Sequence, residues 1–146
     1  MEAFKVNRDI ARLIILQRIE LTSPFLKRLR KLFGRYIFSN FISKYFVNIT
    51  DIGKKYYSLM KNEYEIIQNY LKPKQNILSV GSGVGGLEIL IYKQNPNIKV
   101  SFVEKNYISK KIIYGWDNNN LEAYNNLDLL ETFLKNNDIE KNSFQI

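Results

Sequence analysis

The feature that most constrains this chain is a cluster of four glycines within six residues: Gly81, Gly83, Gly85 and Gly86. The cluster follows a short apolar run over 77–80 and precedes an apolar-periodic segment that ends at the turn 95–97. A second run rich in β-branched residues, 98–103, then leads to an acid, Glu104. This order predicts a strand, a glycine turn, a helix, a turn and a strand, which together form one βαβ unit.

The glycine turn and the acid together predict a nucleoside site. Glycine permits the positive φ angles and close backbone approach of a sharp strand-to-helix turn. The following helix presents free N–H groups and the positive end of its dipole. Glu104 lies 23 residues after Gly81, near the ~20-residue spacing at which an acid accepts hydrogen bonds from ribose hydroxyls. The alternative is a plain tight turn beside an exposed acid, but four glycines are more than such a turn requires.

Two glycine patterns overlap in this stretch. Gly81, Gly83 and Gly86 fit G-x-G-x-x-G, the dinucleotide pattern, whereas Gly81, Gly83 and Gly85 fit G-x-G-x-G. The second pattern, after the run 77–80 and with Glu104 ending the next strand, resembles motif I of the class I S-adenosylmethionine-dependent methyltransferases. Ser79 stands where that family usually has Asp or Glu.

The resemblance implies S-adenosyl-L-methionine as the cofactor and a Rossmann-like fold. It implies that three glycines of the turn pack against the cofactor and that Glu104 holds the ribose. Family members often carry an apolar residue after this acid, in contact with the adenine; here Lys105 has that position, and Tyr107 or Ile108 are the alternatives. The expected cofactor-binding residues are Ser79, Gly81, Ser82, Gly83, Gly85, Glu104 and Lys105. No catalytic residue is assigned from the sequence.

The absence of two residue types limits the chemistry. The chain has 146 residues with no Cys and no His, which excludes thiol nucleophiles, disulfides, imidazole bases and Cys/His metal sites. No metal site is therefore expected. Methyl transfer tolerates this composition, because the sulfonium is already activated and much of the rate can come from alignment.

Charge divides the chain into two predicted parts. The formal net charge is +8. Residues 1–50 hold ten basic and three acidic side chains, whereas residues 51–146 hold twelve and eleven. We therefore predict a basic helical lead-in over 1–50 and a partial Rossmann-like cofactor-binding domain over 51–146.

The lead-in is predicted to be helical. Apolar spacing indicates helices over 7–21 and, with Ser23 as N-cap and Pro24 in the first turn, over 25–33. The second helix has a basic face formed by Lys27, Arg28, Arg30 and Lys31. This face fits an anionic partner such as lipid or RNA, or else is simply solvated. The aromatic-rich run 36–46 is also interpreted as helical.

The remaining elements complete half of a sheet. A helix capped by Thr50–Asp51 and stopped at Pro73 precedes the first strand, and its Tyr56 and Tyr57 belong either to the core or to the pocket. An amphipathic helix is predicted over 121–134, and 142–146 begins a third strand. Trp116–Asp117 either shapes the acceptor side or packs on the core.

The predicted fold class is α/β, a parallel Rossmann-like sheet with only its first half present. An exposed third-strand edge would favour self-association. The chain is therefore expected to be a fragment of a larger enzyme that lacks the wall holding an acceptor, and to be inactive alone. No run approaches the ~20 apolar residues of a membrane span, and the N-terminus lacks a signal peptide, so a cytoplasmic location is expected.

The predicted function is the cofactor-binding portion of a methyltransferase that acts on a small-molecule or glycan acceptor. The run from Glu104 through Trp116–Asp117 loosely resembles bacterial sugar O-methyltransferases. Two alternatives remain open at this point. One is an NAD-dependent oxidoreductase, supported by the G-x-G-x-x-G pattern, and the other is a non-catalytic protein that keeps a nucleoside-binding fold.

Overall fold

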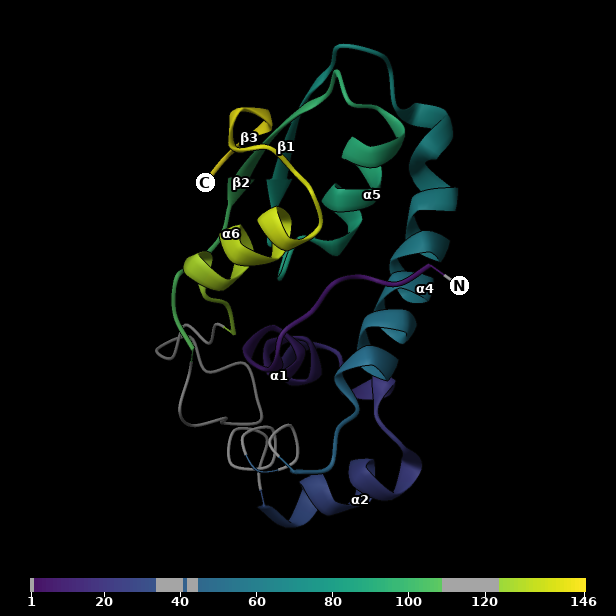
Figure 1. Ribbon diagram of the computed structural model, residues 1–146, viewed down its shortest axis with the longest axis vertical. Coiled ribbons are helices and arrows are strands. Elements are labelled where there is room, and N and C mark those ends of the chain that lie inside the picture. Colours follow the sequence, from purple (N-terminus) through teal and green to yellow (C-terminus); the bar gives the residue numbers. More distant parts are fainter. Residues whose placement is uncertain (1, 34–40, 42–44, 109–123) are drawn as a thin grey trace, which may run out of the picture.

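The structure is a computed structural model that describes residues 2–33, 41, 45–108 and 124–146. Most of the predicted helix over 36–46, and the whole of the Trp116–Asp117 pair, lie outside these residues. The α-helices are α1 (Arg8–Gln17), α2 (Pro24–Phe33), α4 (Ile49–Ile67), α5 (Gly86–Gln94) and α6 (Leu127–Asn136) (Figure 1). The strands are β1 (Asn76–Val80), β2 (Lys99–Val103) and β3 (Phe144–Gln145), and 3-10 turns cover Ile19–Leu21, Gln68–Tyr70 and Lys141–Ser143.

The three strands form one parallel sheet in the order β1-β2-β3. Ser79 pairs with Phe102 in the first ladder, and Val100 pairs with Phe144 in the second. Helix α5 connects β1 to β2, as the βαβ pattern predicted. The mixed α/β class and the third strand are therefore confirmed.

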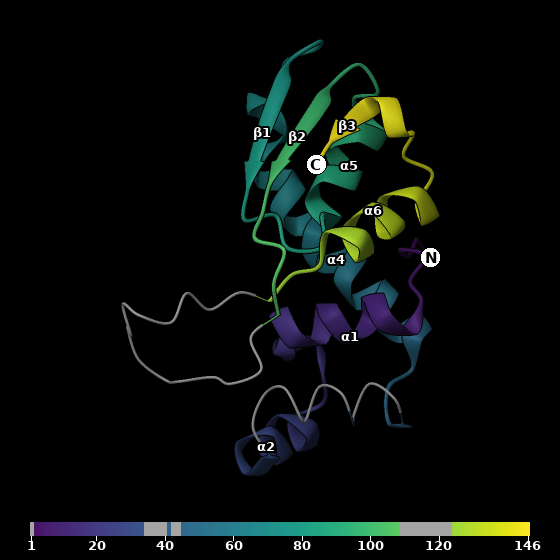
Figure 2. The ribbon, with the colours of Figure 1, turned by 90° about the vertical axis from the view of Figure 1, so that its left-hand side faces the viewer.

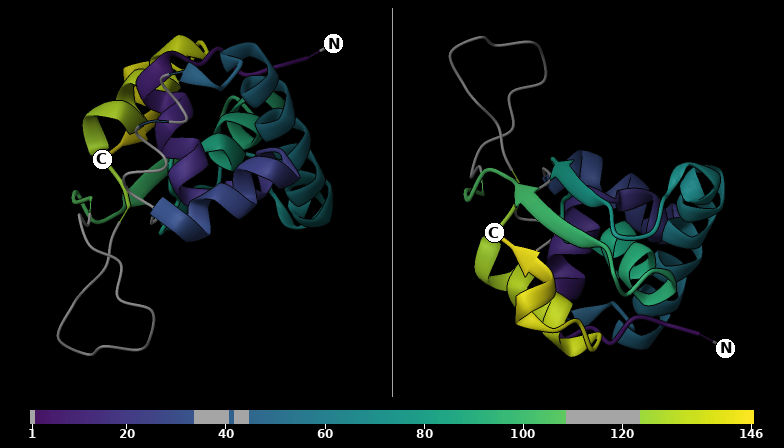
Figure 3. Two further views of the ribbon diagram at one scale, coloured as in Figure 1. Left: turned by 90° about the horizontal axis from the view of Figure 1, so that it is seen from below. Right: turned by 90° about the horizontal axis from the view of Figure 1, so that it is seen from above.

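Helices α4, α5 and α6 lie on one side of this sheet, and α1 and α2 lie beyond its end (Figures 2 and 3). Strand side chains alternate between the two faces, and Val100 and Phe102 on the inner face are buried. On the outer face Leu78, Val80 and Val103 are 64%, 72% and 54% exposed. Parallel sheets are usually covered on both faces, so this apolar outer face is unusual.

Helix α1 belongs to the same core as the sheet and its helices. It packs against α4 and α6, and Ile10 and Ile14 are completely buried. Just before it, the Phe4 ring contacts the rings of Tyr56 and Phe133. The first part of the predicted lead-in thus shares its core with residues beyond 51. The division at residue 50 stays a prediction.

Side-chain caps set the helix boundaries and correct two predictions. The Asn48 side chain accepts from the Asp51 N–H, so α4 begins at Ile49 and the predicted Thr50–Asp51 cap is wrong. Asn126 accepts from the Leu129 N–H in the same way, so α6 begins at Leu127 and residues 124–126 are not helical, contrary to the prediction, while 121–123 lie outside the described residues. Asparagine competes well for this position because its side chain satisfies an otherwise unpaired N–H.

Helix α2 lies at the opposite end of the molecule from the sheet (Figure 1). The predicted cap is confirmed, since Ser23 Oγ accepts from the Leu26 N–H and Pro24 begins the helix. Lys27 and Arg28 are exposed, and an anionic partner for them stays a prediction. None of the helices that the structure describes is long and apolar enough to cross a bilayer.

Candidate functional site

The glycine turn has the backbone geometry that the sequence predicted. Gly81, Gly83 and Gly85 have φ angles of 71°, 63° and 82°, which side chains other than glycine rarely adopt. Gly85 is the N-cap of α5, and its own N–H donates to the Ser82 carbonyl. The turn therefore leads directly from the end of β1 into the first turn of α5.

Three polar side chains from distant parts of the chain hold this turn. The Gly83 N–H donates to Glu104 Oε2 at 3.0 Å, and the Gly83 carbonyl accepts from Asn125 Nδ2 at 2.6 Å. Gln17 lies above the same glycine: a Cβ atom at Gly83 would be 2.6 Å from Gln17 Oε1. The turn is thus fixed from β2, from the segment before α6, and from the end of α1.

Glu104 is the acid that the sequence assigned to the ribose. It follows β2 and is half-buried. Its second oxygen, Oε1, accepts from the Lys105 N–H at 2.9 Å. Both oxygens of the carboxyl group therefore accept backbone N–H groups, which fixes the side chain beside the turn. The acid predicted from spacing alone therefore lies directly on the glycine turn.

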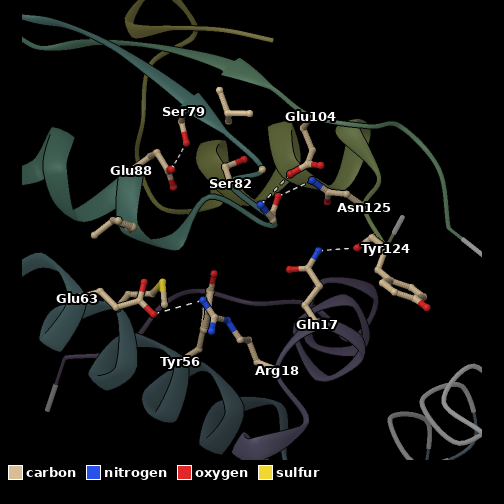
Figure 4. Close-up of a pocket in the computed structure, with 15 residues that line it drawn as sticks. Gln17, Arg18, Tyr56, Glu63, Ser79, Ser82, Glu88, Glu104, Tyr124 and Asn125 are labelled. Atoms are coloured by element: carbon tan, nitrogen blue, oxygen red, sulfur yellow. Dashed lines mark hydrogen bonds and ion pairs between the residues drawn. The ribbon is translucent and has the colours of Figure 1, made fainter. Parts of the chain in front are cut away.

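A cavity of about 540 Å³ opens beside the turn (Figure 4). This volume lies within the range of about 300–1,000 Å³ that is usual for small-molecule sites. The walls come from the ends of α1 and β1, the first turn of α5, the side of α4, and the residues after β2 and before α6. They comprise Gln17, Arg18, Tyr56, Met60, Glu63, Ser79, Val80, Gly81, Ser82, Gly83, Leu87, Glu88, Glu104, Tyr124 and Asn125.

Glu88 is a buried acid in the wall of this cavity. It is 6% exposed, and its Oε1 accepts a hydrogen bond from the Ser79 hydroxyl. Its other oxygen, Oε2, and the hydroxyl of Ser82 are buried with no partner among the described residues. Burial raises the pKa of the Glu88 carboxyl, and the carboxylates of Glu63 and Glu104 add to the shift, while the Ser79 hydrogen bond opposes it.

The opposite wall carries a cation, an acid and a phenol. Arg18 Nη2 lies 3.3 Å from Glu63 Oε1. Burial raises the pKa of the Tyr56 hydroxyl well above its usual value; Glu88 adds to this shift and Arg18 opposes it. Tyr56 is therefore a neutral hydroxyl within electrostatic reach of both charged groups. Figure 4 shows Arg18, Glu63 and Tyr56 across the cavity from Glu88 and Ser79.

The structure brings together most of the predicted cofactor-binding residues. Ser79, Gly81, Ser82, Gly83 and Glu104 all line the cavity.

Two predicted residues lie outside the cavity walls. Gly85 is buried behind the turn, where a Cβ atom would be 2.7 Å from Leu130 Cδ1. Lys105 is exposed, and its Nζ lies 6.0 Å from the centre of the Tyr107 ring. The sequence assigned Tyr56 and Tyr57 either to the core or to the pocket. Tyr56 belongs to the core and also lines the cavity, whereas Tyr57 does not line the cavity.

Several wall residues were not predicted. Glu88 had a detectable feature, since it is the one acid in the otherwise apolar helix sequence GLEILIYKQ. No sequence feature marked the other three, Gln17, Arg18 and Asn125, because each reaches the turn or the cavity only through tertiary packing. Gln17 Nε2, for example, donates to the Tyr124 carbonyl 107 residues further along the chain.

Comparisons with known proteins found no match to this chain among protein-family models, curated proteins or solved structures. In the described part of the chain, no group of three or more acids is arranged to hold a metal ion.

Proposed function

We propose that this chain is the cofactor-binding portion of an S-adenosylmethionine-dependent methyltransferase with a Rossmann-like fold. The observation that carries the proposal is the hydrogen bond from the Gly83 N–H to Glu104 Oε2 at the edge of the cavity. It places the acid that ends the second strand on the turn that follows the first. A ribose beside the turn would offer its two hydroxyls to this carboxylate.

The strand order supports the same proposal. In doubly wound nucleotide-binding sheets of order 3-2-1-4-5-6, the first three strands lie side by side with the first of them at the switch point, where the ligand binds. Here β3, β2 and β1 are adjacent in that order and parallel. The cavity begins at the carboxyl end of β1, where Val80 and Gly81 line it.

The charges of the walls favour a cationic ligand over a diphosphate. Among the described residues, three acids line the cavity, Glu63, Glu88 and Glu104, whereas the one cation there, Arg18, is already paired with Glu63. S-adenosylmethionine carries a positive sulfonium and an ammonium group. The pyrophosphate of NAD would bring negative charge to these acids, and the Gly83 N–H that could bind it already donates to a carboxylate.

In the proposed site the residues of this chain bind and orient. Glu104 accepts from the ribose hydroxyls, and the turn permits close approach of the nucleoside. Methyl transfer moves a carbon between the sulfonium and a nucleophile, and alignment of these two supplies much of the rate. The acceptor, a small molecule or a glycan hydroxyl, stays a proposal with no residue assigned to it.

Calorimetry and thermal shift with S-adenosylhomocysteine and NAD test this function. The expected result is a rise in melting temperature with S-adenosylhomocysteine and none with NAD at the same concentration, because only a ligand that binds the folded state stabilises it. A shift with NAD alone would overturn the proposal in favour of the oxidoreductase. Methyl transfer by this chain to any acceptor in a panel of sugars and small hydroxyl compounds would exclude the non-catalytic alternative.

A further inference from the structure

Glu88 and Ser82 each have a buried oxygen without a partner, and both residues line one cavity. Glu88 Oε2 and Ser82 Oγ have no hydrogen-bond partner among the described residues, and both residues belong to the walls beside the turn. Buried polar atoms in native proteins are nearly always satisfied, and an unsatisfied one calls for an explanation. A ligand group that donates more than one hydrogen bond would supply one.

We propose that Glu88 Oε2 and Ser82 Oγ form a seat for a primary ammonium group of the bound ligand. An ammonium carries three N–H donors and no acceptor, so it matches a wall of two free acceptors. This inference rests on the proposed function and deepens it. In S-adenosylmethionine the group would be the amino group of the methionine moiety, recognised by an acid on α5 and not by position 79, which is a serine here.

Among the residues that the structure describes, no cation in the walls pairs with this acid. Arg18 is the one basic side chain of this set that lines the cavity, and its ion pairs are with Glu63 and Glu20. Among the described residues, the side-chain partner of the Glu88 carboxyl is the neutral hydroxyl of Ser79. A buried carboxyl without a cationic partner is unfavourable as the anion, and an ammonium ligand would supply the missing charge.

A second void borders Glu88 on its other side and offers a competing explanation. It measures about 10 Å³ and lies under β2 and β3, at the lower limit for one water molecule. Its walls are mainly apolar, including Val100, Phe102 and Leu134. The two hydroxyls there, of Tyr92 and Ser143, already bond to each other. A water in this void could still bond to Glu88 and to these hydroxyls, but it would leave Ser82 Oγ unpaired, because Ser82 does not line the void.

Three nucleosides with different tails separate the ammonium seat from the ribose site. S-adenosylhomocysteine carries the amino and carboxylate groups, its decarboxylated analogue with a 3-aminopropylthio tail carries the amine alone, and 5′-methylthioadenosine carries neither. Glu88→Gln removes the negative charge but keeps an oxygen for the Ser79 hydroxyl. This substitution should weaken the binding of both amine-bearing ligands about 10- to 150-fold, the range for a hydrogen bond to a charged group. The affinity for 5′-methylthioadenosine should not change.

Two further variants complete the design. Ser82→Ala should weaken the same two ligands by a smaller factor, about 2- to 10-fold. Glu104→Gln should instead weaken all three alike, since all three contain the ribose. Melting temperatures of the variants without ligand identify any loss of binding that results from unfolding.

The pH dependence gives an independent readout. An ammonium group pairs only with the ionised form of Glu88. In the ligand-free protein burial raises the pKa of this carboxyl, the charges of Glu63 and Glu104 raise it further, and the hydrogen bond from Ser79 lowers it. Tyr56 and Arg18 face this carboxyl from the other wall. Affinity for the amine-bearing ligands should therefore fall as pH is lowered through that raised pKa, and Glu88→Gln should remove this dependence.

The outcomes separate the two proposals. If Glu88→Gln binds all three nucleosides as the wild type does, or loses all three equally, the ammonium seat is overturned and the nucleoside site stands. If the wild type binds none of the three, the proposed function fails and the seat fails with it. Selective loss of the two amine-bearing ligands supports both.

Discussion

Gln17 at the end of α1 donates a hydrogen bond from Nε2 to the Tyr124 carbonyl, 2.6 Å away. The other end of the same amide, Oε1, lies 2.6 Å from the place a Cβ atom would take at Gly83. The side chain thus joins the segment before α6 and at the same time covers the glycine turn. The two glycines at 81 and 83 differ in this respect, since a Cβ atom at Gly81 would meet nothing within 4 Å.

This difference predicts unequal effects of two alanine substitutions. Gly81→Ala and Gly83→Ala both place alanine at a positive φ, at a cost of about 1–2 kcal/mol. Gly83→Ala should lower the free energy of unfolding by about a further 0.5–1.5 kcal/mol, because the displaced Gln17 loses its hydrogen bond to Tyr124. Urea denaturation followed by circular dichroism measures both values.

A double mutant separates the clash from the backbone strain. In a Gln17→Ala background the extra cost of Gly83→Ala should disappear, whereas the cost of Gly81→Ala should be unchanged. Strict additivity of Gln17→Ala and Gly83→Ala would show that the amide does not cover the turn.

Glu104→Ala should weaken S-adenosylhomocysteine binding by about 1.5–3 kcal/mol, since it removes a charged acceptor for the ribose hydroxyls. Isothermal titration calorimetry measures the change. Glu140→Ala is the matched control, because Glu140 is an exposed acid that does not line the cavity. Equal affinity of wild type and Glu104→Ala would refute the ribose assignment.

Glu88→Gln should stabilise the ligand-free protein at neutral pH. The pKa of Glu88 is raised in the folded state above its ordinary value of 4.5, so the folded protein holds this proton more tightly than the unfolded chain does. Stability is therefore lost as pH rises from 4.5 through the raised pKa. Each tenfold change in the acidity constant costs about 1.4 kcal/mol.

The increase in stability caused by Glu88→Gln should thus be largest at high pH and should become smaller toward pH 4.5. Melting temperatures of wild type and variant between pH 4 and 8 measure it. A constant difference across this range would show that Glu88 does not titrate with an altered pKa.

Residues 51–146 alone are expected not to fold cooperatively, because α1 supplies buried side chains to the shared core. In the full chain, Leu13→Ala should lower the free energy of unfolding by about 2–5 kcal/mol. Lys54→Ala, at an exposed position of α4, should change the free energy of unfolding by no more than about 0.5 kcal/mol. A sigmoidal urea transition for the 51–146 fragment would contradict this expectation and support the predicted division at residue 50.

The outer face of the sheet predicts self-association. Leu78 and Val103 are exposed there, and among the described residues neither β1 nor β3 pairs with a further strand, so both edge strands can pair with another chain. Leu78→Lys with Val103→Lys should lower the concentration-dependent mass measured by sedimentation equilibrium. Ile66→Lys, which removes an apolar side chain of similar exposure from α4, should leave it unchanged.

The sequence predicted those parts of the site that lie close together along the chain. The turn, its positive φ angles and Glu104 all belong to a single βαβ unit, in which spacing determines position. Helix starts were less accurate, since Asn48 and Asn126 competed with neighbouring polar residues for the capping position.

The opposite wall of the cavity could not be predicted in this way. Arg18 and Gln17 reach this wall because the buried side chains of Ile10 and Ile14 hold α1 in the core. No local sequence pattern indicates which element a helix will pack against. The sequence pattern also grouped α1 with a basic lead-in, because charge counts do not distinguish a buried apolar helix face from a solvated one. Glu88 was detectable as a lone acid in an apolar helix, but its unpaired oxygen is visible only in three dimensions.

The contacts that close the site span long stretches of the chain, which has a consequence for the order of folding. Gln17 meets Tyr124 across 107 residues, and the Lys5 N–H donates to Asn137 Oδ1 across 132. Contacts of such separation form slowly, because the intervening chain must be ordered first. During synthesis the βαβ unit leaves the ribosome well before its partners at 124–137. The glycine turn gains its hydrogen bond from Asn125 only after that residue has been synthesised, so a nascent chain can close the cavity only once residues 124–137 have left the ribosome.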